Sequence, residues 1–292
     1  MNVRKIVWFL VLAFGISWGI ALAYYLGGGR LTSPGAALVL VCYMFGPLTA
    51  ALLVQVLVAR ELDPVALGVS FRLNRWWWAA WLGPPLAALL TLGISLLIPG
   101  VEYSPEMAGL FARFQSVLTP EQVQQMKDQL AALPVHPLWL ALLSALVAGP
   151  TVNALAAFGE EAGWRGLLQD QLAPLGFWPS SLVIGFIWGV WHAPIILQGH
   201  NYPQHPLAGV FMMTAWCMLL SPLLCFVRLQ ASSVVAAAVA HGTLNACAGI
   251  PLMVIVGGND LLVGLTGLAG FVAAALLNLG VAWYWRWAER SV

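Results

Sequence analysis

Apolar stretches of roughly 20 residues recur along this chain, and they restrict its fold more than any other feature. A bilayer core about 30 Å thick requires roughly 20 predominantly apolar residues for each helical crossing. Hydrophobic residues make up 61% of the 292 residues and charged residues only 8%, whereas soluble domains average about 25% charged residues. The sequence therefore predicts an all-α, polytopic membrane bundle of about eight transmembrane helices.

We expect one integral membrane domain over residues 1–292. The first span contains Ala21-Leu22-Ala23, a possible signal-peptidase site, but its apolar run exceeds the roughly 7 to 15 residues of a signal peptide, so we expect an uncleaved anchor. The expected spans cover residues 6–26, 36–58, 76–98, 140–170, 178–198, 207–227, 232–256 and 261–285.

The positions of basic residues predict the orientation of these spans. Eight crossings with a cytoplasmic N-terminus leave three basic residues outside, namely Arg30, Arg113 and Lys127. They place nine inside, namely Arg4, Lys5, Arg60, Arg72, Arg75, Arg165, Arg228, Arg286 and Arg290. This distribution satisfies the positive-inside rule, so we expect a multi-pass protein of the cytoplasmic membrane with both termini cytoplasmic. The net charge of +1 gives no attraction to nucleic acid.

The only long polar insertion covers approximately residues 101–136. It contains Thr119-Pro120-Glu121-Gln122, in which a capping residue, a proline in the first turn and a glutamine predict the start of a helix. We expect an extracytoplasmic, exposed helical hairpin that serves as a solvated connection. A role in gating access of a substrate is the alternative.

Ionisable side chains occur at three places within the expected spans, where each is a functional hypothesis by default. The first is Glu160-Glu161 in the fourth span. Glu161 and Arg165 stand at i and i+4, the spacing of an ion pair on one helical face. Because neighbouring residues project about 100° apart on a helix, Glu160 is the freer carboxylate.

The second place ends in His192, which follows Trp188 by four residues. Gly185 and Gly189 lie on the same side of this span and would let another helix approach closely. The third place is His241 with Asn245, which lie one turn apart and point together.

These groups are expected at one level of the bilayer. Counted from the expected cytoplasmic helix ends at about 1.5 Å per residue, Glu160, His192 and His241 lie about 15, 18 and 14 Å deep. A carboxylate, two imidazoles and the amide of Asn245 in one layer provide what a water-activating site requires, namely a base, an orienting partner and oxyanion donors. Taken singly, each residue could instead link helices as a structural hydrogen-bonding group. The motif-bearing core is expected at about 140–256.

A metal ion is the open question for this chemistry. Glu160, His192 and His241 could supply the ligands of a catalytic zinc ion with an open position. No HExxH sequence is present, and we predict metal-free glutamate chemistry with no cofactor. Zinc remains the alternative.

The chain resembles the intramembrane endopeptidases related to the CAAX prenyl protease of the Rce1 type, also called the CPBP or Abi family. The family motifs EExxxR, FxxxH and HxxxN correspond here to Glu160-Glu161 with Arg165, Trp188 with His192, and His241 with Asn245, in the family order. Residues 1–135 contain no motif that matches.

The resemblance implies an eight-span membrane protease. Glu160 and His192 would activate a water, His241 and Asn245 would stabilise the oxyanion, and Glu161 and Arg165 would hold the first motif in shape, with Trp188 supporting them as an aromatic wall. Trp188 departs from the family pattern, which has Phe at this position, and the larger ring could reshape the substrate cavity.

We therefore predict an intramembrane endopeptidase acting on a membrane-anchored or lipidated peptide, with membrane lipid as its other partner. A second hypothesis is a proton-coupled transporter, in which the Glu and His residues form a relay. A third is a non-catalytic interaction or immunity protein of the membrane that keeps the motifs for packing. The sequence does not identify the substrate.

Overall fold

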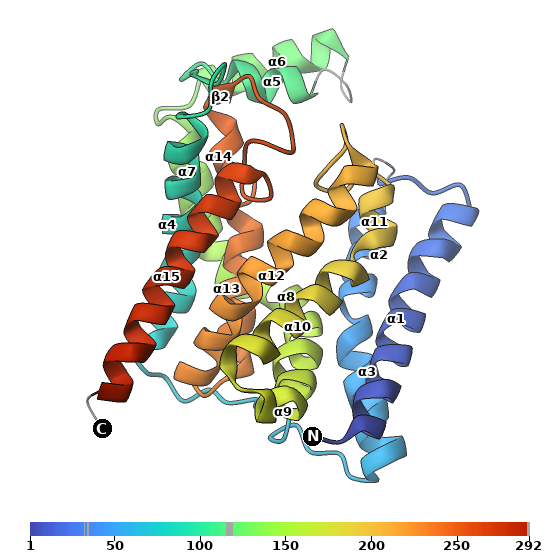
Figure 1. The fold of residues 1–292 in the computed structure, drawn as a ribbon. Coiled ribbons are helices and arrows are strands. Elements are labelled where there is room, and N and C mark those ends of the chain that lie inside the picture. Colours follow the sequence, from blue (N-terminus) through green and yellow to red (C-terminus); the bar gives the residue numbers. More distant parts are fainter. Residues whose placement is uncertain (32, 34, 115–118, 291–292) are drawn as a thin grey trace.

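The computed structural model describes residues 1–31, 33, 35–114 and 119–290. Among these residues, seven helical spans are long and apolar enough to cross a membrane. One additional pass is made by the shorter apolar helix α10 (Phe177–Trp191), which continues into α11 (Ala193–Leu197) (Figure 1). It is the fifth pass in chain order. The predicted all-α, polytopic bundle of about eight spans is confirmed.

Six of the passes contain long, regular helices or their direct continuations. Their elements are α1 (Val3–Leu26), α4 (Trp76–Ser95), α10 with α11, α12 (Pro206–Gln230), α13 (Val234–Cys247) with α14 (Ile250–Met253), and α15 (Leu268–Arg290).

The other two passes change helix type along their length. The second pass consists of α2 (Ala36–Met44), α3 (Gly46–Val54) and the π-helical η1 (Gln55–Ala59). The fourth consists of α7 (Pro137–Ala148), the π-helical η2 (Gly149–Asn153), α8 (Ala154–Glu161), the π-helical η3 (Ala162–Leu168), α9 (Gln169–Leu172) and the 3₁₀-helical η4 (Ala173–Leu175). Widened π turns frequently occur at functional sites, and η3 begins directly after Glu161.

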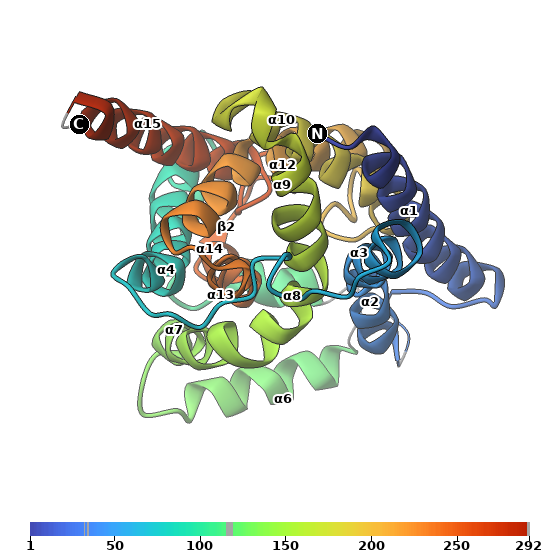
Figure 2. The same ribbon diagram turned by 90° about the horizontal axis from the view of Figure 1, so that it is seen from below.

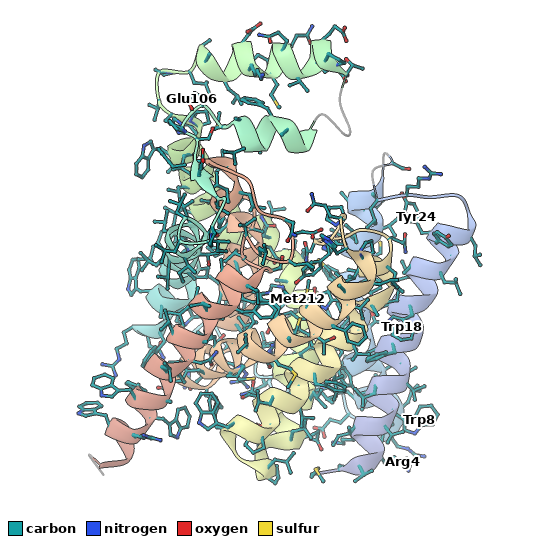
Figure 3. All side chains as sticks on the ribbon, turned by 45° about the horizontal axis from the view of Figure 1, so that its top comes forward. Arg4, Trp8, Trp18, Tyr24, Glu106 and Met212 are labelled. Atoms are coloured by element: carbon teal, nitrogen blue, oxygen red, sulfur yellow. The ribbon has the colours of Figure 1, made fainter. Side chains whose placement is uncertain are left out.

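The bundle has two distinct ends. Both chain termini lie at one end, which we call the terminus end (Figure 1). The opposite end, the α5–α6 end, carries α5 (Ala108–Phe114) and α6 (Pro120–Ala131), with Glu106 beside them and Arg4 at the other end of the molecule (Figure 3). The predicted capping box of Thr119 and Gln122 starts α6. Here β1 (Glu102–Tyr103) pairs antiparallel with β2 (Ile255–Val256).

α13 occupies the centre of the bundle. Of an 18-residue window in its span, 72% is buried, compared with 22% for α1. It contacts α4, α7, α8 and α12 (Figure 2). Gly242 makes the contact with α8 possible, because a Cβ atom there would lie 2.4 Å from the backbone nitrogen of Ala154. His241 and Thr243 of α13 are therefore buried inside protein, whereas Asn245 is exposed.

α10 and α12 approach each other as closely as the glycines predicted. A Cβ atom on Gly185 would lie 2.6 Å from the Cys217 carbonyl oxygen, and one on Gly189 would lie 2.4 Å from the Thr214 Cα atom. Small residues allow such backbone contact between helices in a membrane. The contact fixes the height of His192 relative to α12.

The span expected over 178–198 is interrupted, because α10 ends at Trp191 with His192 as its C-cap and α11 starts at Ala193. Pro194 lacks an N–H group and its ring disfavours a continuous helix. The break frees the carbonyl oxygen of Trp191, which accepts hydrogen bonds from the Trp18 indole at 2.9 Å and from the Tyr43 hydroxyl. α1 and α2 thereby anchor the end of α10.

The span expected over 261–285 also begins too early, since α15 starts at Leu268. Residues 257–267 form a loop, in which Gly257, Gly258 and Gly264 adopt positive φ angles that glycine favours. Val263 and Leu265 are nevertheless buried. These apolar side chains are buried against the interior of the bundle, although they do not belong to a helix.

Candidate active site

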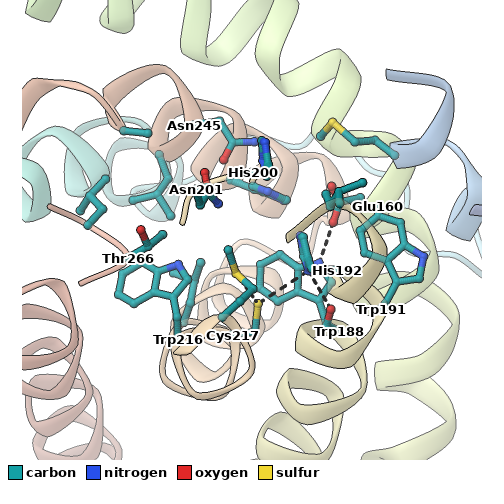
Figure 4. Close-up of a pocket in the computed structure, with 18 of the residues that line it drawn as sticks. Glu160, Trp188, Trp191, His192, His200, Asn201, Trp216, Cys217, Asn245 and Thr266 are labelled. Atoms are coloured by element: carbon teal, nitrogen blue, oxygen red, sulfur yellow. Dashed lines mark hydrogen bonds between the residues drawn. The ribbon is translucent and has the colours of Figure 1, made fainter. Parts of the chain in front are cut away.

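A cavity of about 270 Å³ lies between α2, α8, α10, α12 and α13 (Figure 4). Its wall contains all four residues predicted to be catalytic, which are Glu160, His192, His241 and Asn245, and it also contains Trp188. Most of the remaining wall is apolar, including Leu40, Met44, Ile195, Met213, Leu220 and Leu244. The fold brings polar groups from three spans to one partly open cavity within apolar surroundings.

Glu160 is held in this cavity by Trp188. The indole Nε1–H of Trp188 donates to Oε2 of Glu160 at 2.6 Å (Figure 4). Both side chains are 2% exposed. In the described part of the chain, the second carboxylate oxygen, Oε1, accepts no hydrogen bond, so it is the oxygen that can meet a substrate or a water.

His192 is oriented by the backbone of the same tryptophan. Its Nδ1 lies 2.8 Å from the carbonyl oxygen of Trp188. A carbonyl can only accept, so Nδ1 carries the proton, and Nε2 of the neutral ring is an acceptor. Trp188 therefore positions Glu160 through its side chain and His192 through its backbone.

Glu161 forms the predicted ion pair with Arg165 and also binds His241. Its Oε1 accepts from Nη1 of Arg165 at 2.9 Å and from Nδ1 of His241 at 2.8 Å. All three side chains are buried, and a buried charge is tolerated only when it is paired. Arg165 Cζ also lies 4.4 Å from the ring centroid of Trp188, which polarises that ring.

Asn245 stands one turn beyond His241 on α13 and lines the same cavity. It is exposed, whereas His241 is buried. The two residues therefore occupy different depths of the cavity, with Asn245 nearer its opening. Glu160 makes its hydrogen bond to Trp188 rather than to either imidazole among the described residues.

Sequence reasoning missed two polar residues of the wall, His200 and Asn201. They follow α11 in a loop, so their polarity carried no signal of a membrane-embedded position. Burial lowers the pKa of the His200 imidazole. The sulfur of Cys217, also in the wall, lies 4.0 Å from Nδ1 of His192. The π-helical turn that follows Glu161 had no signal in the sequence either.

The zinc alternative requires a group of donor side chains that could hold the ion. Among residues 1–31, 33, 35–114 and 119–290, no three His, Cys, Asp or Glu side chains are grouped so that they could hold a metal ion. Oε2 of Glu160 and Nδ1 of His192 and of His241 are bound to protein partners, whereas Oε1 of Glu160 and Nε2 of His192 have no protein partner among the described residues. No step of the chemistry below passes through a metal.

A comparison with known families agrees with this geometry. The model described as type II CAAX prenyl endopeptidase Rce1-like matches residues 134–247. This segment contains all three motifs. Over these residues the chain is similar to the Rce1-like family. No curated protein matches the chain.

The Rce1-like segment runs from just before α7 to the end of α13 and supplies every motif residue of the cavity. α2 lies outside the match, yet Leu40, Tyr43 and Met44 complete the cavity wall. The family is a family of proteases, and the apolar spans make this chain a multi-pass membrane protein. The fold thus brings the motif residues of the matched segment together inside a bundle of apolar helices.

Proposed function

We propose that this chain is an intramembrane endopeptidase that hydrolyses a peptide bond with a water activated by Glu160 and His192. The observation that carries the proposal is that both side chains line one cavity while each keeps one acceptor atom unused, Oε1 of Glu160 and Nε2 of His192. A water between two such acceptors can donate to both, which orients a lone pair toward a substrate carbonyl.

In the first step, Glu160 removes a proton from this water as the water oxygen attacks the carbonyl carbon of the scissile bond. The resulting tetrahedral intermediate carries its negative charge on the former carbonyl oxygen. In the second step, the protonated Glu160 gives the same proton to the leaving nitrogen as the carbon–nitrogen bond breaks. The products are a carboxylic acid and an amine, and no cofactor is consumed.

His241 and Asn245 are the proposed donors to the oxyanion. With Nδ1 of His241 directed at Glu161, the Nε2–H group of its imidazolium form is free to donate. The amide of Asn245 supplies a second donor from the same face of α13. Preorganised donors in a water-poor site are among the largest contributions to catalysis, since they stabilise charge that develops only in the transition state.

Glu161 and Arg165 act on this arrangement indirectly. Their ion pair holds the start of η3, and Glu161 orients the His241 ring. A charged Glu161 also favours the imidazolium form of His241, because opposite charges attract strongly where water is scarce. Their role is positioning.

The substrate we propose is a peptide of a membrane-anchored or lipidated protein. The apolar lining of the cavity suits apolar side chains next to the scissile bond, and the membrane concentrates an anchored substrate near the site.

The test is a Glu160→Gln variant, purified and reconstituted in lipid nanodiscs. It is assayed by mass spectrometry against a library of lipid-anchored peptides, including prenylated ones. We expect products from the unaltered protein and none from the variant, with an unchanged unfolding temperature. Glu61→Gln, the same substitution at an exposed site, is the matched control and should cleave normally. Cleavage by Glu160→Gln at the normal rate contradicts the proposal, and proton flux in liposomes without a peptide product supports a relay instead.

A further inference from the structure

A second, larger cavity adjoins the catalytic one. It has a volume of about 740 Å³, and we call it the vestibule. Both cavities are lined by Asn201, Ala248, Leu265 and Thr266. The vestibule therefore lies directly beside the cavity that holds Glu160, with these four residues between them.

The vestibule reaches the surface at the α5–α6 end. Ala112 of α5 and Gln204, Gly257 and Gly258 of the loops line it, and all four are exposed. In Figure 1 the loop that follows β2 and the loop that follows α11 lie at this end of the bundle, below α5 and α6. A segment of peptide can therefore approach the catalytic cavity from this end.

A pocket of about 260 Å³ at the terminus end reaches Arg165, but it shares no lining residue with the catalytic cavity, and packed side chains lie between the two. Trp164 and Trp191 are 0% exposed, and their ring centroids lie 5.8 Å apart. Phe9 of α1 packs edge-on against Trp164 at 5.3 Å. The buried pair Glu161 and Arg165 fills the interior toward the same end. This layer separates Glu160 from the terminus end.

The two loops at the vestibule mouth are tied together, so the opening is a built feature. Asp260 accepts hydrogen bonds from the Gln204 backbone N–H at 2.7 Å and from Nδ1 of His205 at 2.6 Å. Gln204 Oε1 accepts from the Asp260 backbone N–H at 3.1 Å. Deeper inside, the Tyr202 hydroxyl donates to the Thr266 carbonyl oxygen at 2.6 Å.

The distribution of basic residues indicates on which side of the membrane the vestibule opens. Of the twelve basic residues, only Arg30, Arg113 and Lys127 belong to segments at the α5–α6 end. Basic residues accumulate on the cytoplasmic side of membrane proteins. By that rule, the α5–α6 end faces away from the cytoplasm.

We infer that the substrate reaches Glu160 from the extracytoplasmic side, through the vestibule. This inference rests on the proposed function. It assigns as substrates the extracytoplasmic segments next to the membrane anchor of other proteins, in extended conformation, rather than cytoplasmic lipidated C-termini. The vestibule suits such a segment, because Asn201, Gln204 and Thr266 present polar groups to a peptide backbone while Leu252, Val263 and Leu265 accommodate its side chains.

The test uses two matched substitutions, Ala112→Cys at the vestibule and Ala173→Cys in η4 at the terminus end. Both alanines are exposed. A membrane-impermeant polymer reagent that forms a disulfide is applied to right-side-out and inverted vesicles that also contain a cleavable lipid-anchored peptide. Both substitutions are made in a Cys42→Ser background, because Cys42 is exposed whereas Cys217, Cys225 and Cys247 are buried. That background is the blank. Pro203→Cys, also in the vestibule wall, replaces Ala112→Cys should that variant fail to fold.

We expect Ala112→Cys to react in right-side-out vesicles and its cleavage rate to fall by at least about tenfold, since an occluded site loses its substrate. Reduction of the disulfide should restore the rate. Ala173→Cys should react only in inverted vesicles and cleave normally after modification. Reaction of Ala173→Cys from outside, or full cleavage by modified Ala112→Cys, overturns the inference.

The inference and the proposed function fail in different ways. Loss of cleavage in Glu160→Gln together with unhindered cleavage by modified Ala112→Cys would leave the endopeptidase in place and refute the access route. Full cleavage by Glu160→Gln would refute the proposed chemistry, whatever the sidedness of labelling.

Discussion

Trp188→Phe is the substitution that most directly tests how Glu160 is held. It keeps an aromatic ring at this position and removes only the indole N–H that donates to Glu160 at 2.6 Å. The backbone carbonyl that orients His192 is unchanged. The variant therefore separates the hydrogen bond to the carboxylate from the rest of the tryptophan's contacts.

The size of the effect follows from the type of hydrogen bond. A hydrogen bond to a charged group contributes about 1.5 to 3 kcal/mol. If all of this energy orients the carboxylate in the transition state, kcat falls by about 10- to 100-fold, at about 1.4 kcal/mol for each tenfold change. The freed carboxylate is also a stronger base, which offsets part of the loss, so we expect a fall of about tenfold.

The pH dependence gives a second measurement with a definite sign. The indole donates to the ionised carboxylate and favours that form, so its removal makes Glu160 easier to protonate. Protonated Glu160 is inactive as a base, and the acidic limb of the kcat profile should therefore move to higher pH. Trp139→Phe, at a tryptophan that is 60% exposed, is the control and should change neither value. A folded Trp188→Phe variant with unchanged kcat and an unmoved acidic limb would refute the positioning role of the indole.

Two further predictions concern packing and metal dependence. Gly189→Val should lower the free energy of unfolding by about 1 to 3 kcal/mol, because its Cβ would lie 2.4 Å from the Thr214 Cα atom. The control is Gly93→Val, at a site with no atom within 4 Å of the new Cβ. It should leave the thermal unfolding temperature in detergent almost unchanged. Cleavage by the purified protein should continue after incubation with 1,10-phenanthroline, because the proposed mechanism uses Glu160 as the base and the described residues contain no group of three His, Cys, Asp or Glu side chains that could hold a metal ion. Activity lost to the chelator and regained with zinc would contradict this.

The number and type of spans could be predicted from the sequence because a bilayer permits few solutions. Every backbone polar group in hydrocarbon must be paired within the chain, so a long apolar stretch becomes a helix. The same reasoning failed over 261–267, where apolar residues pack as a loop against protein instead of lipid. Hydropathy indicates that a segment avoids water. It does not show whether the segment packs against lipid or against protein.

The motif spacing predicted local pairs well and distant ones poorly. The Glu161–Arg165 pair follows from four-residue spacing on one helix. The hydrogen bond from Trp188 to Glu160 crosses 28 residues, and the contact of His241 with Glu161 crosses 80. Both depend on how α8, α10 and α13 cross, which is set by the glycine contacts of the whole bundle. No local pattern encodes those crossings.

The adjacent glutamates differ in role because helix geometry sends them in different directions. Glu161 turns toward α13 and η3, where Arg165 and His241 both bind its Oε1, and its charge becomes part of the buried framework. Glu160 turns toward the cavity and α10, where only a neutral N–H group meets it. A neutral partner stabilises a carboxylate less than a cation does, which leaves Glu160 able to exchange a proton. The cationic partners therefore bind Glu161, while Glu160 binds only the indole among the described residues. This arrangement leaves Glu160 available as a base inside a bundle whose other buried charges are paired.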